Sequence, residues 1–331
     1  MNAELPVRVW LTVADHFEPL GMGASDEDAR SRVARWRTQW PSIAVKHADS
    51  TGRGPQYTFF YPEEEYRAWL LDPLAELADA AVADVEIHLH HDGEGEQNFV
   101  DRIGRFKETL RSRHGLLRQR DGKIPFGFIH GNWALDNSRP DGRWCGLNNE
   151  IALLRDLDCY ADFTMPSGNS DTQARTVNEI YWAVDDSQSP KSYDRGIRVQ
   201  PGGGCQGDLL IVPGPLGIRW RGRIVPRLDS GELAGYDPPS DYRFKRWLDC
   251  APRLGNDIFI KLFSHGCQDR NSFALLEHRG LDSLFGSAER ICESRGYALH
   301  YVSAWEMFQA IEAITGRAAA KVTSERSALV R

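Results

Sequence analysis

Apolar runs of strand length alternate with amphipathic stretches of helical spacing about seven times along the chain. Strands that are separated by helices pair side by side in the same direction, so this order favours an α/β protein with a parallel sheet. We expect the sheet to close, or nearly close, into a (β/α) barrel. The expected strands cover 7–13, 57–61, 85–91, 125–130, 160–165, 257–263 and 297–302, and the expected helices cover 26–40, 63–81, 96–114, 147–156, 241–250, 272–295 and 304–314.

The length of 331 residues fits one large α/β domain, which we place at residues 1–315. Hydrophobic residues make up 41% of the chain, enough to bury a substantial core. Gly, Pro and Arg are dense between about 185 and 240, and the alternation stops there, which predicts a hairpin insertion or lid. Residues 316–331 are expected to form a C-terminal tail.

Charge and hydropathy argue against several classes of protein. Forty basic residues against 47 acidic residues give a net charge of −7, which disfavours binding to bulk nucleic acid or to an anionic membrane. No apolar run approaches the ~18 residues needed to cross a bilayer, and the first residues lack the basic segment of a signal peptide. The six cysteines form no CxxC pair, which is typical of reduced thiols. We therefore expect a cytoplasmic location, without a nucleic-acid or membrane partner.

Polar and ionisable side chains directly follow five of the expected strands. In parallel α/β folds the carboxyl ends of the strands meet at one edge, where the loops that follow them build the active site. One polar strand end could arise by chance, but five indicate a functional site. The residues concerned are Asp15 and His16, the stretch 88–94, His130 and Asn132, Thr164 and Ser167, and His265.

The stretch 85–94, VEIHLHHDGE, carries three histidines and three acids. Apolar residues alternate with Glu86, His88 and His90, which places these three on one face of a strand and His91 on the opposite face, against a helix. Imidazole and carboxylate groups are costly to bury alone, and a divalent cation is a partner that both bind. The stretch therefore predicts a metal site, in the first place for Zn²⁺, with Mn²⁺, Co²⁺ and Fe²⁺ as alternatives.

The order of these motifs resembles that of the polysaccharide deacetylases, the NodB-homology group of carbohydrate esterases. In that family the first strand ends in a Thr-Phe-Asp-Asp-like motif, whose counterpart here is Thr12-Val13-Ala14-Asp15. The His-Leu-His-His and His-Gly-Asn-Trp runs resemble a divergent, deacetylase-like subgroup. Four further stretches resemble motifs of the family in the same order, so that the resemblance covers most of residues 11–266. They are Thr58-Phe59-Phe60, the pair Glu86-Ile87 with His90 and Glu94 after it, Pro166, and Leu262-Phe263-Ser264-His265.

The resemblance implies a seven-stranded, distorted TIM-like barrel and a metal-dependent hydrolase that removes acetyl groups from a carbohydrate. Asp15, His90 and Glu94 would hold the cation, with His88 as a further ligand or as a group behind the ligands. The sequence departs from the family at two positions that act together. Ala14 stands where the family has its catalytic base, and Thr164 stands where it has the arginine that orients this base.

A different residue must therefore activate the water that attacks the acyl carbonyl. His16 and Glu18 are the candidates for this base, because they follow the first strand directly. His265 is the candidate acid, since an imidazole titrates near neutral pH and can donate a proton to the departing group. The expected partner is an acylated saccharide, and the residues expected to bind it are His130, Asn132, Trp133 and Ser167.

The residues alone leave two alternatives open. A glycosidase on the same barrel would use a pair of carboxylates, for which Glu18, Glu86, Asp92 and Glu94 supply enough acids. A barrel that has lost the family's acid and arginine could also bind a sugar without catalysis. The positions of the carboxylates test the first alternative, and metal content together with acyl release tests the second.

Overall fold

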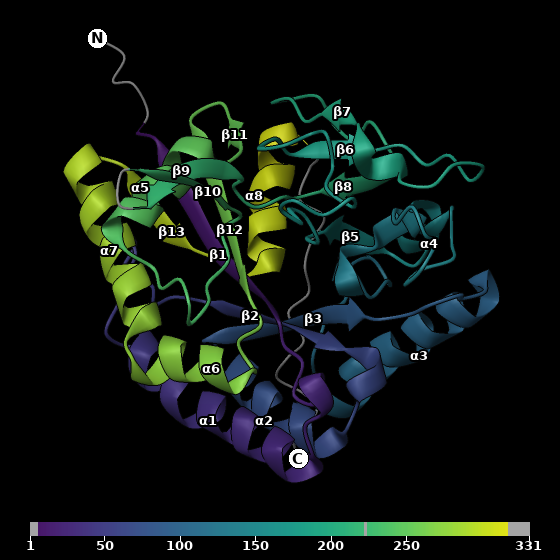
Figure 1. Ribbon diagram of the computed structural model, residues 1–331, viewed down its shortest axis with the longest axis horizontal. Helices are drawn as coiled ribbons and strands as arrows, with labels where there is room; N and C mark the ends of the chain where they lie inside the picture. The colour runs from purple at the N-terminus through teal and green to yellow at the C-terminus, as the bar shows by residue number, and fades with distance from the viewer. Residues whose placement is uncertain (1–5, 222–223, 317–331) are drawn as a thin grey trace.

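The computed structural model describes residues 6–221 and 224–316 (Figure 1). Its strands are β1 Arg8–His16, β2 Tyr57–Pro62, β3 Ala83–Leu89, β4 Phe126–His130, β5 Cys159–Asp162, β6 Tyr181–Ala183, β7 Ile197–Arg198, β8 Leu209–Ile211, β9 Gly217–Arg221, β10 Val225–Asp229, β11 Arg253–Leu254, β12 Asp257–Ser264 and β13 Ala298–Tyr301. Its α-helices are α1 Asp26–Ala44, α2 Ala68–Asp79, α3 Glu96–His114, α4 Glu150–Asp156, α5 Asp241–Cys250, α6 Asp269–Ser272, α7 Gly280–Arg295 and α8 Ala304–Thr315.

The central sheet is mostly parallel. Its strands lie in the order β11–β12–β1–β2–β3–β4–β5–β8–β6–β7, and β13 pairs with the first half of β1. The neighbours from β12 to β8 are parallel, whereas β11, β6 and β7 join antiparallel. The expected α/β class is therefore confirmed, and the arrangement is compatible with a barrel-like fold. Within the described ranges the outermost strands β11 and β7 do not pair, so a closed, seven-stranded barrel is not confirmed.

The region expected to be an insertion contributes to the central sheet as well as to a hairpin. β8 pairs parallel with β5, and β6 pairs antiparallel with β8. Leu209, Leu210 and Ile211 are almost completely buried, so this short apolar run extends the sheet instead of standing outside it. The apolar run 209–212 is expected to be a short strand of a hairpin insertion, and the structure makes it a strand of the central sheet instead.

Alternate residues of the strands contact two different hydrophobic layers. The outer face of the sheet, which includes Val9 and Val13 of β1, packs against α1, α2, α3 and α7. The inner face packs against α8, the yellow helix between the β1 and β5 regions in Figure 1. Because both faces are buried, the strands carry nearly continuous apolar sequences. The inner layer contains Ala14, Phe60, Ile129, Tyr160, Phe259, Trp305 and Phe308.

β1 lies in the middle of the sheet and is held along its whole length. Residues 8–15 pair with residues 257–264 of β12, and the last four residues of β1 pair with β2. The chain then enters α1 through a capping box in which Ser25 and Asp28 satisfy each other's backbone amides. Trp36 of α1 packs against Phe17, with ring centroids 6.0 Å apart. The end of β1 is thus a rigid support for the side chains that follow it.

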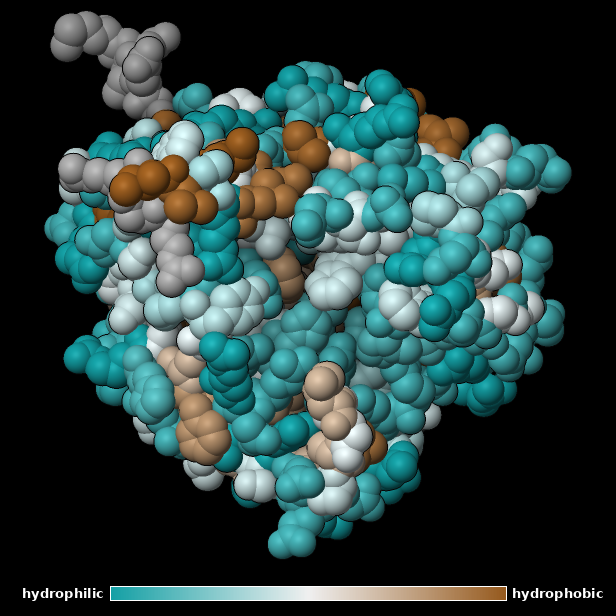
Figure 2. All heavy atoms as spheres, in the orientation of Figure 1, coloured by the Kyte–Doolittle hydropathy of each residue, from teal (hydrophilic) through white to brown (hydrophobic). Residues whose placement is uncertain are grey.

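β9 and β10 form an antiparallel hairpin inside the range where an insertion was expected. Its side chains Ile218, Trp220 and Val225 are 61%, 53% and 58% exposed. Figure 2 shows apolar side chains gathered on this part of the surface, at the upper left. That the hairpin closes over a site stays a prediction.

Two expectations concern the ends and the hydropathy of the chain. Most of the expected tail, residues 317–331, lies outside the described residues. Among the helices of the described ranges, none combines the length and the apolar character that crossing a membrane requires.

Candidate functional site

Five ionisable side chains meet at the carboxyl ends of three strands. His16 ends β1 and Glu18 follows it, His88 lies in β3 and His90 directly after it, and His265 follows β12. The ligand atoms of His16, Glu18 and His265 lie within 4.8 Å of one another, and so do those of Glu18, His88 and His90. Glu18 belongs to both groups, and we call the five residues the strand-end cluster.

Hydrogen bonds orient the rings of His88 and His90 so that one nitrogen of each approaches Glu18. His88 Nδ1 donates to the carbonyl oxygen of Ile129 at 2.8 Å, and His88 Nε2 lies 3.3 Å from Glu18 Oε1. His90 Nδ1 lies 2.5 Å from Glu64 Oε1, and His90 Nε2 lies 3.6 Å from Glu18 Oε1. Both Nε2 atoms therefore converge on the same carboxylate oxygen.

His16, His265 and Trp133 form the opposite side of the cluster. The ring of His16 lies 4.8 Å from the ring of His265 and 5.5 Å from that of Trp133, measured between centroids. His16 is 2% exposed, and its Nε2 has no hydrogen-bond partner among the residues that the structure describes. A buried polar nitrogen without a partner is costly, so this atom points to a ligand or a substrate group at the site.

Burial and neighbouring charges determine the ionisation of the cluster. Burial, together with the charges of His265 and His88, lowers the pKa of His16 well below its usual range. Burial also lowers the pKa of His265. Burial opposes ionisation of Glu18, but the hydrogen bond from His88 and the nearby imidazoles outweigh it and lower the pKa of Glu18 to about 2. At neutral pH the cluster thus combines an ionised carboxylate with neutral imidazoles of His16 and His265. Burial opposes protonation of His90, but its hydrogen bond to Glu64 outweighs burial and raises the pKa of His90, so a cation bound there would displace a proton.

The cluster is accessible from one side. The side chain of His90 is 30% exposed and that of Glu18 is 13% exposed, whereas His88 is fully buried. The loop after β4 comes so close to His90 that only glycine fits at position 131, because a Cβ there would lie 2.3 Å from His90 Cδ2. A small molecule can therefore approach Glu18 and His90 from solvent, along a wall that this loop provides.

Asp15 points away from the strand-end cluster. Successive residues of a strand alternate between the two faces, and because His16 occupies the inner face, Asp15 faces outward. There its carboxylate accepts hydrogen bonds from the amide of Gly266 at 2.7 Å and from the hydroxyl of Tyr57 at 3.1 Å. The structure does not bring Asp15 together with His90, and the carboxylates beside His90 are those of Glu18 and Glu64.

Glu94 also lies apart from the expected ligands. Its carboxylate pairs with Arg102 of α3 at 2.8 Å and accepts a hydrogen bond from Asn98. The physical reason is that Glu94 stands two residues before the start of α3, where its charge interacts with the first turns of this helix. The structure thus brings His90 together with Glu18 and His88, and it brings neither Asp15 nor Glu94 into this group.

The pH dependence of stability distinguishes the observed position of Asp15 from a ligand position. Burial is the largest influence on Asp15 and raises its pKa from 3.8 to about 7. The folded state therefore binds this proton more tightly than the unfolded state, so its contribution to stability is present below pH 4 and is lost as the pH rises through 7. The wild-type protein should lose up to about 4 kcal/mol of its free energy of unfolding between pH 4 and pH 8 through Asp15, and the Asp15→Asn variant should not show this loss. Denaturant unfolding at the two pH values measures the difference.

The control for this prediction is Asp26→Asn, at an exposed position. It should not change the difference between the unfolding free energies at pH 4 and pH 8 to a comparable extent. Asp15→Asn should also have the same metal content as the wild-type protein. A lower metal content in a folded Asp15→Asn variant would contradict the outward position of this carboxylate.

The residues expected to bind substrate fall into different places. Trp133 contacts the strand-end cluster, with its ring 5.7 Å from that of His265. Asn132 is half-buried beside it in the same short turn. Ser167 has a buried hydroxyl that makes no hydrogen bond within the described part of the chain. His130 is fully buried and does not join the strand-end cluster.

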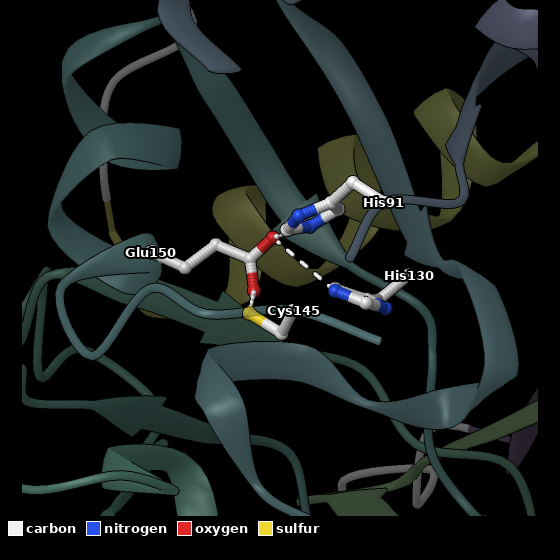
Figure 3. Close-up of side chains that lie close together, drawn as sticks. All are labelled: His91, His130, Cys145 and Glu150. Carbon is white, nitrogen blue, oxygen red and sulfur yellow. Dashed lines mark hydrogen bonds and ion pairs between the residues drawn. The ribbon is translucent and has the colours of Figure 1, made fainter. Parts of the chain in front are cut away.

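His91, His130, Cys145 and Glu150 form a second cluster, which we call the buried quartet (Figure 3). Nε2 of His91 lies 2.9 Å from Glu150 Oε1, and Nε2 of His130 lies 3.5 Å from the same oxygen. The sulfur of Cys145 lies 3.4 Å from Glu150 Oε2. All four residues are buried, and their ligand atoms lie within 4.8 Å of one another. The buried quartet could bind a metal ion.

Sequence reasoning missed three of the residues in these sites. Glu64 directly follows β2 and contacts His90, so the pattern of polar strand ends contained a signal for it. Cys145 and Glu150 lie in and after the long connection between β4 and α4, without the spacing of a known metal motif. For these two residues only the folded path of the connection reveals their partners.

A scan against models of protein families gives no match, and a search of the curated proteins gives none either. What the protein does must therefore be inferred from its sites and from the resemblance of its motifs.

Proposed function

We propose that the protein is a metal-dependent hydrolase that removes acetyl or related acyl groups from a saccharide, on a distorted, seven-stranded (β/α) barrel of the NodB-homology type. The observation that carries this proposal is the strand-end cluster, in which a carboxylate and four imidazoles meet at the carboxyl ends of parallel strands and are accessible from one side. The resemblance of the motifs to those of polysaccharide deacetylases supports the same class of reaction.

The geometry of Glu18, His88 and His90 fits a divalent cation. His88 Nδ1 donates to a backbone carbonyl, so a cation that displaces the Nε2 proton now shared with Glu18 would meet a neutral ring with its Nε2 lone pair directed at it. His90 is oriented in the same way by its contact with Glu64. Two imidazoles and one carboxylate with further positions open are the ligands of a catalytic zinc site, and Mn²⁺, Co²⁺ or Fe²⁺ accept the same donors. Glu18, His88 and His90 would therefore hold the ion.

The remaining residues of the cluster are placed to move protons. A bound divalent ion supplies a water of lowered pKa and polarises an acyl carbonyl. His16 can accept the proton of the attacking water at Nε2, the atom without another partner among the described residues. Both imidazoles start neutral, so the proton that His16 takes up is the one that reaches the departing nitrogen or oxygen as the acyl C–N or C–O bond breaks. His265, whose ring centroid lies 4.8 Å from that of His16, can relay it. Trp133 offers an aromatic face to a sugar ring beside both imidazoles.

The acids considered for a glycosidase do not gather in one place. Glu86 is buried in an ion pair deeper in the sheet, and Glu94 pairs with Arg102. Asp92 accepts a hydrogen bond from a backbone amide at 2.7 Å. Of these acids, Glu18 lies in the strand-end cluster, and within the described ranges the other three belong to no ligand group with it. The placement of the carboxylates therefore gives no support to that alternative.

Metal removal tests the proposal. We expect chelator-treated protein to release no acetate from a panel of N-acetylated and O-acetylated saccharides. Reloading with Zn²⁺, Mn²⁺ or Co²⁺ should raise the rate by at least about 10²-fold, because the ion supplies both the nucleophile and the polarisation of the carbonyl. Acetate release is measured together with the metal content of the same samples. A loaded protein that releases acyl groups from no member of the panel would contradict the proposal.

A further inference from the structure

We propose that the buried quartet is a second metal site, which holds a structural Zn²⁺ and fixes the connection between β4 and α4. The site goes beyond the proposed hydrolase activity and does not depend on it. Its ligands would be His91 after β3, His130 at the end of β4, Cys145 in the connection and Glu150 at the start of α4. Figure 3 shows these four side chains pointing toward one another from separate segments of the chain.

Two backbone amides are directed at the sulfur of Cys145, whereas burial and the charge of Glu150 raise the pKa of its thiol as long as no cation is bound. Cys145 is fully buried, and its sulfur accepts hydrogen bonds from the backbone amides of Asn137 at 3.2 Å and Leu147 at 3.5 Å. Two amide groups directed at one sulfur stabilise negative charge on it, and the thiolate is the form that binds metals. A cation between Cys145 and Glu150 would add the positive charge that, together with these amides, allows the thiol to ionise.

The orientation of His130 leaves a repulsion that a cation would remove. Its Nδ1 donates to the carbonyl oxygen of Gly131 at 2.6 Å, so the neutral ring carries a lone pair on Nε2. That lone pair faces Glu150 Oε1 across 3.5 Å, and Nε2 has no hydrogen-bond partner in the described part of the chain. Two buried lone pairs that face each other without a proton repel, whereas a cation between them would attract both.

Charge, size and burial agree with zinc in a structural site. One thiolate, one carboxylate and two neutral imidazoles balance the charge of a divalent ion, and binding releases the proton of the Cys145 thiol as the metal–sulfur bond forms. Ligand atoms around tetrahedral zinc lie about 3.3–3.7 Å apart, so the quartet, whose atoms lie within 4.8 Å, needs shifts of about 1 Å or less. Four protein ligands and complete burial leave no position for a substrate.

The position of this site gives it a consequence for the strand-end cluster. The connection that Cys145 and Glu150 would fix begins with Gly131 and Trp133, which contact His90 and His16. A metal in the buried quartet would therefore hold one wall of the open site in place.

Cobalt spectroscopy examines the buried quartet separately, because the strand-end cluster contains no sulfur. Co²⁺ bound through a thiolate shows a strong sulfur-to-metal charge-transfer absorption in the near ultraviolet. We expect the full-length protein, stripped of metal and titrated with Co²⁺, to develop this absorption up to one equivalent per chain, and Zn²⁺ to displace it. Absence of the absorption in the wild-type protein overturns the inference.

Cysteine variants assign the absorption. Cys145→Ser should remove it, whereas the matched variant Cys250→Ser, at a half-buried position outside the quartet, should keep it. If Cys145→Ser does not fold, the serine variants of the other five cysteines decide, since all of them must keep the absorption. Survival in a folded Cys145→Ser variant, or loss in one of the other five, overturns the inference.

The same samples separate this inference from the proposed hydrolase. Glu18→Gln should lose acyl release and keep the thiolate absorption. A wild-type protein that shows the absorption but releases no acyl group supports the second site and contradicts the hydrolase. A wild-type protein that releases acyl groups but shows no absorption supports the hydrolase and contradicts the second site.

Discussion

Glu18→Gln is expected to lower kcat/KM for acyl release by about 10³-fold, which corresponds to about 4 kcal/mol of transition-state stabilisation. Glu18 Oε1 is the atom that Nε2 of His88 and Nε2 of His90 approach, at 3.3 Å and 3.6 Å. Glutamine keeps the shape of the side chain but lacks the negative charge that attracts a cation, so the ion and its chemistry should be lost together. Initial rates at several substrate concentrations measure kcat/KM, and elemental analysis measures the ion.

Glu94→Gln is the matched control, because it makes the same chemical change at the carboxylate that the motif resemblance places at the metal. Glu94 pairs with Arg102 and lies outside the strand-end cluster, so the variant should keep kcat/KM within a few-fold of wild type. The reverse order, a large loss in Glu94→Gln and none in Glu18→Gln, would restore the ligand set expected from the resemblance.

Glu86→Ala is expected to lower the free energy of unfolding by about 3–5 kcal/mol. The carboxylate of Glu86 is fully buried and accepts hydrogen bonds from the amide of Gly127 at 2.6 Å and from the hydroxyl of Tyr160 at 2.9 Å. It also forms an ion pair with Arg118, which Asp84 contacts at 2.7 Å from another side. Truncation leaves two buried donors without an acceptor and weakens the neutralisation of the guanidinium. Equilibrium unfolding in denaturant measures the loss.

Two further variants define the cause of that loss. Glu86→Gln should be less harmful than Glu86→Ala, because an amide oxygen can still accept from the Gly127 amide. Glu108→Ala, on an exposed part of α3, should change stability by no more than about 0.5 kcal/mol. Equal effects of Glu86→Ala and Glu108→Ala would show that the buried contacts of Glu86 contribute little.

The parallel sheet could be predicted from the sequence because each long strand is separated from the next by a helix with a clear apolar stripe. The strand-end rule also selected His16, His88 and His265 correctly as neighbours, since parallel strands carry their carboxyl ends to one edge. The short strand at 209–212 could also be predicted, but no crossover helix precedes it, so the sequence indicated a hairpin insertion and not the pairing with β5 that the structure shows. The partner of a short strand is therefore what the sequence left open.

The choice between Asp15 and Glu18 could not be made from the sequence. Both faces of β1 are buried under apolar layers, so the run before Asp15 shows no polar–apolar alternation that would mark the inner face. The family motif then favoured Asp15, and a change of one position along a strand reverses the direction of a side chain. The buried quartet depends on loop paths between distant segments, which no local pattern encodes.

Two adjacent histidines at the end of β3 serve different sites, since His90 belongs to the strand-end cluster and His91 to the buried quartet. Adding or deleting one residue beside them would exchange the sides to which the two imidazoles project, and both sites would fail at once. Insertions and deletions that preserve both proposed sites should therefore fall elsewhere in the chain and should leave the spacing at 90–91 untouched.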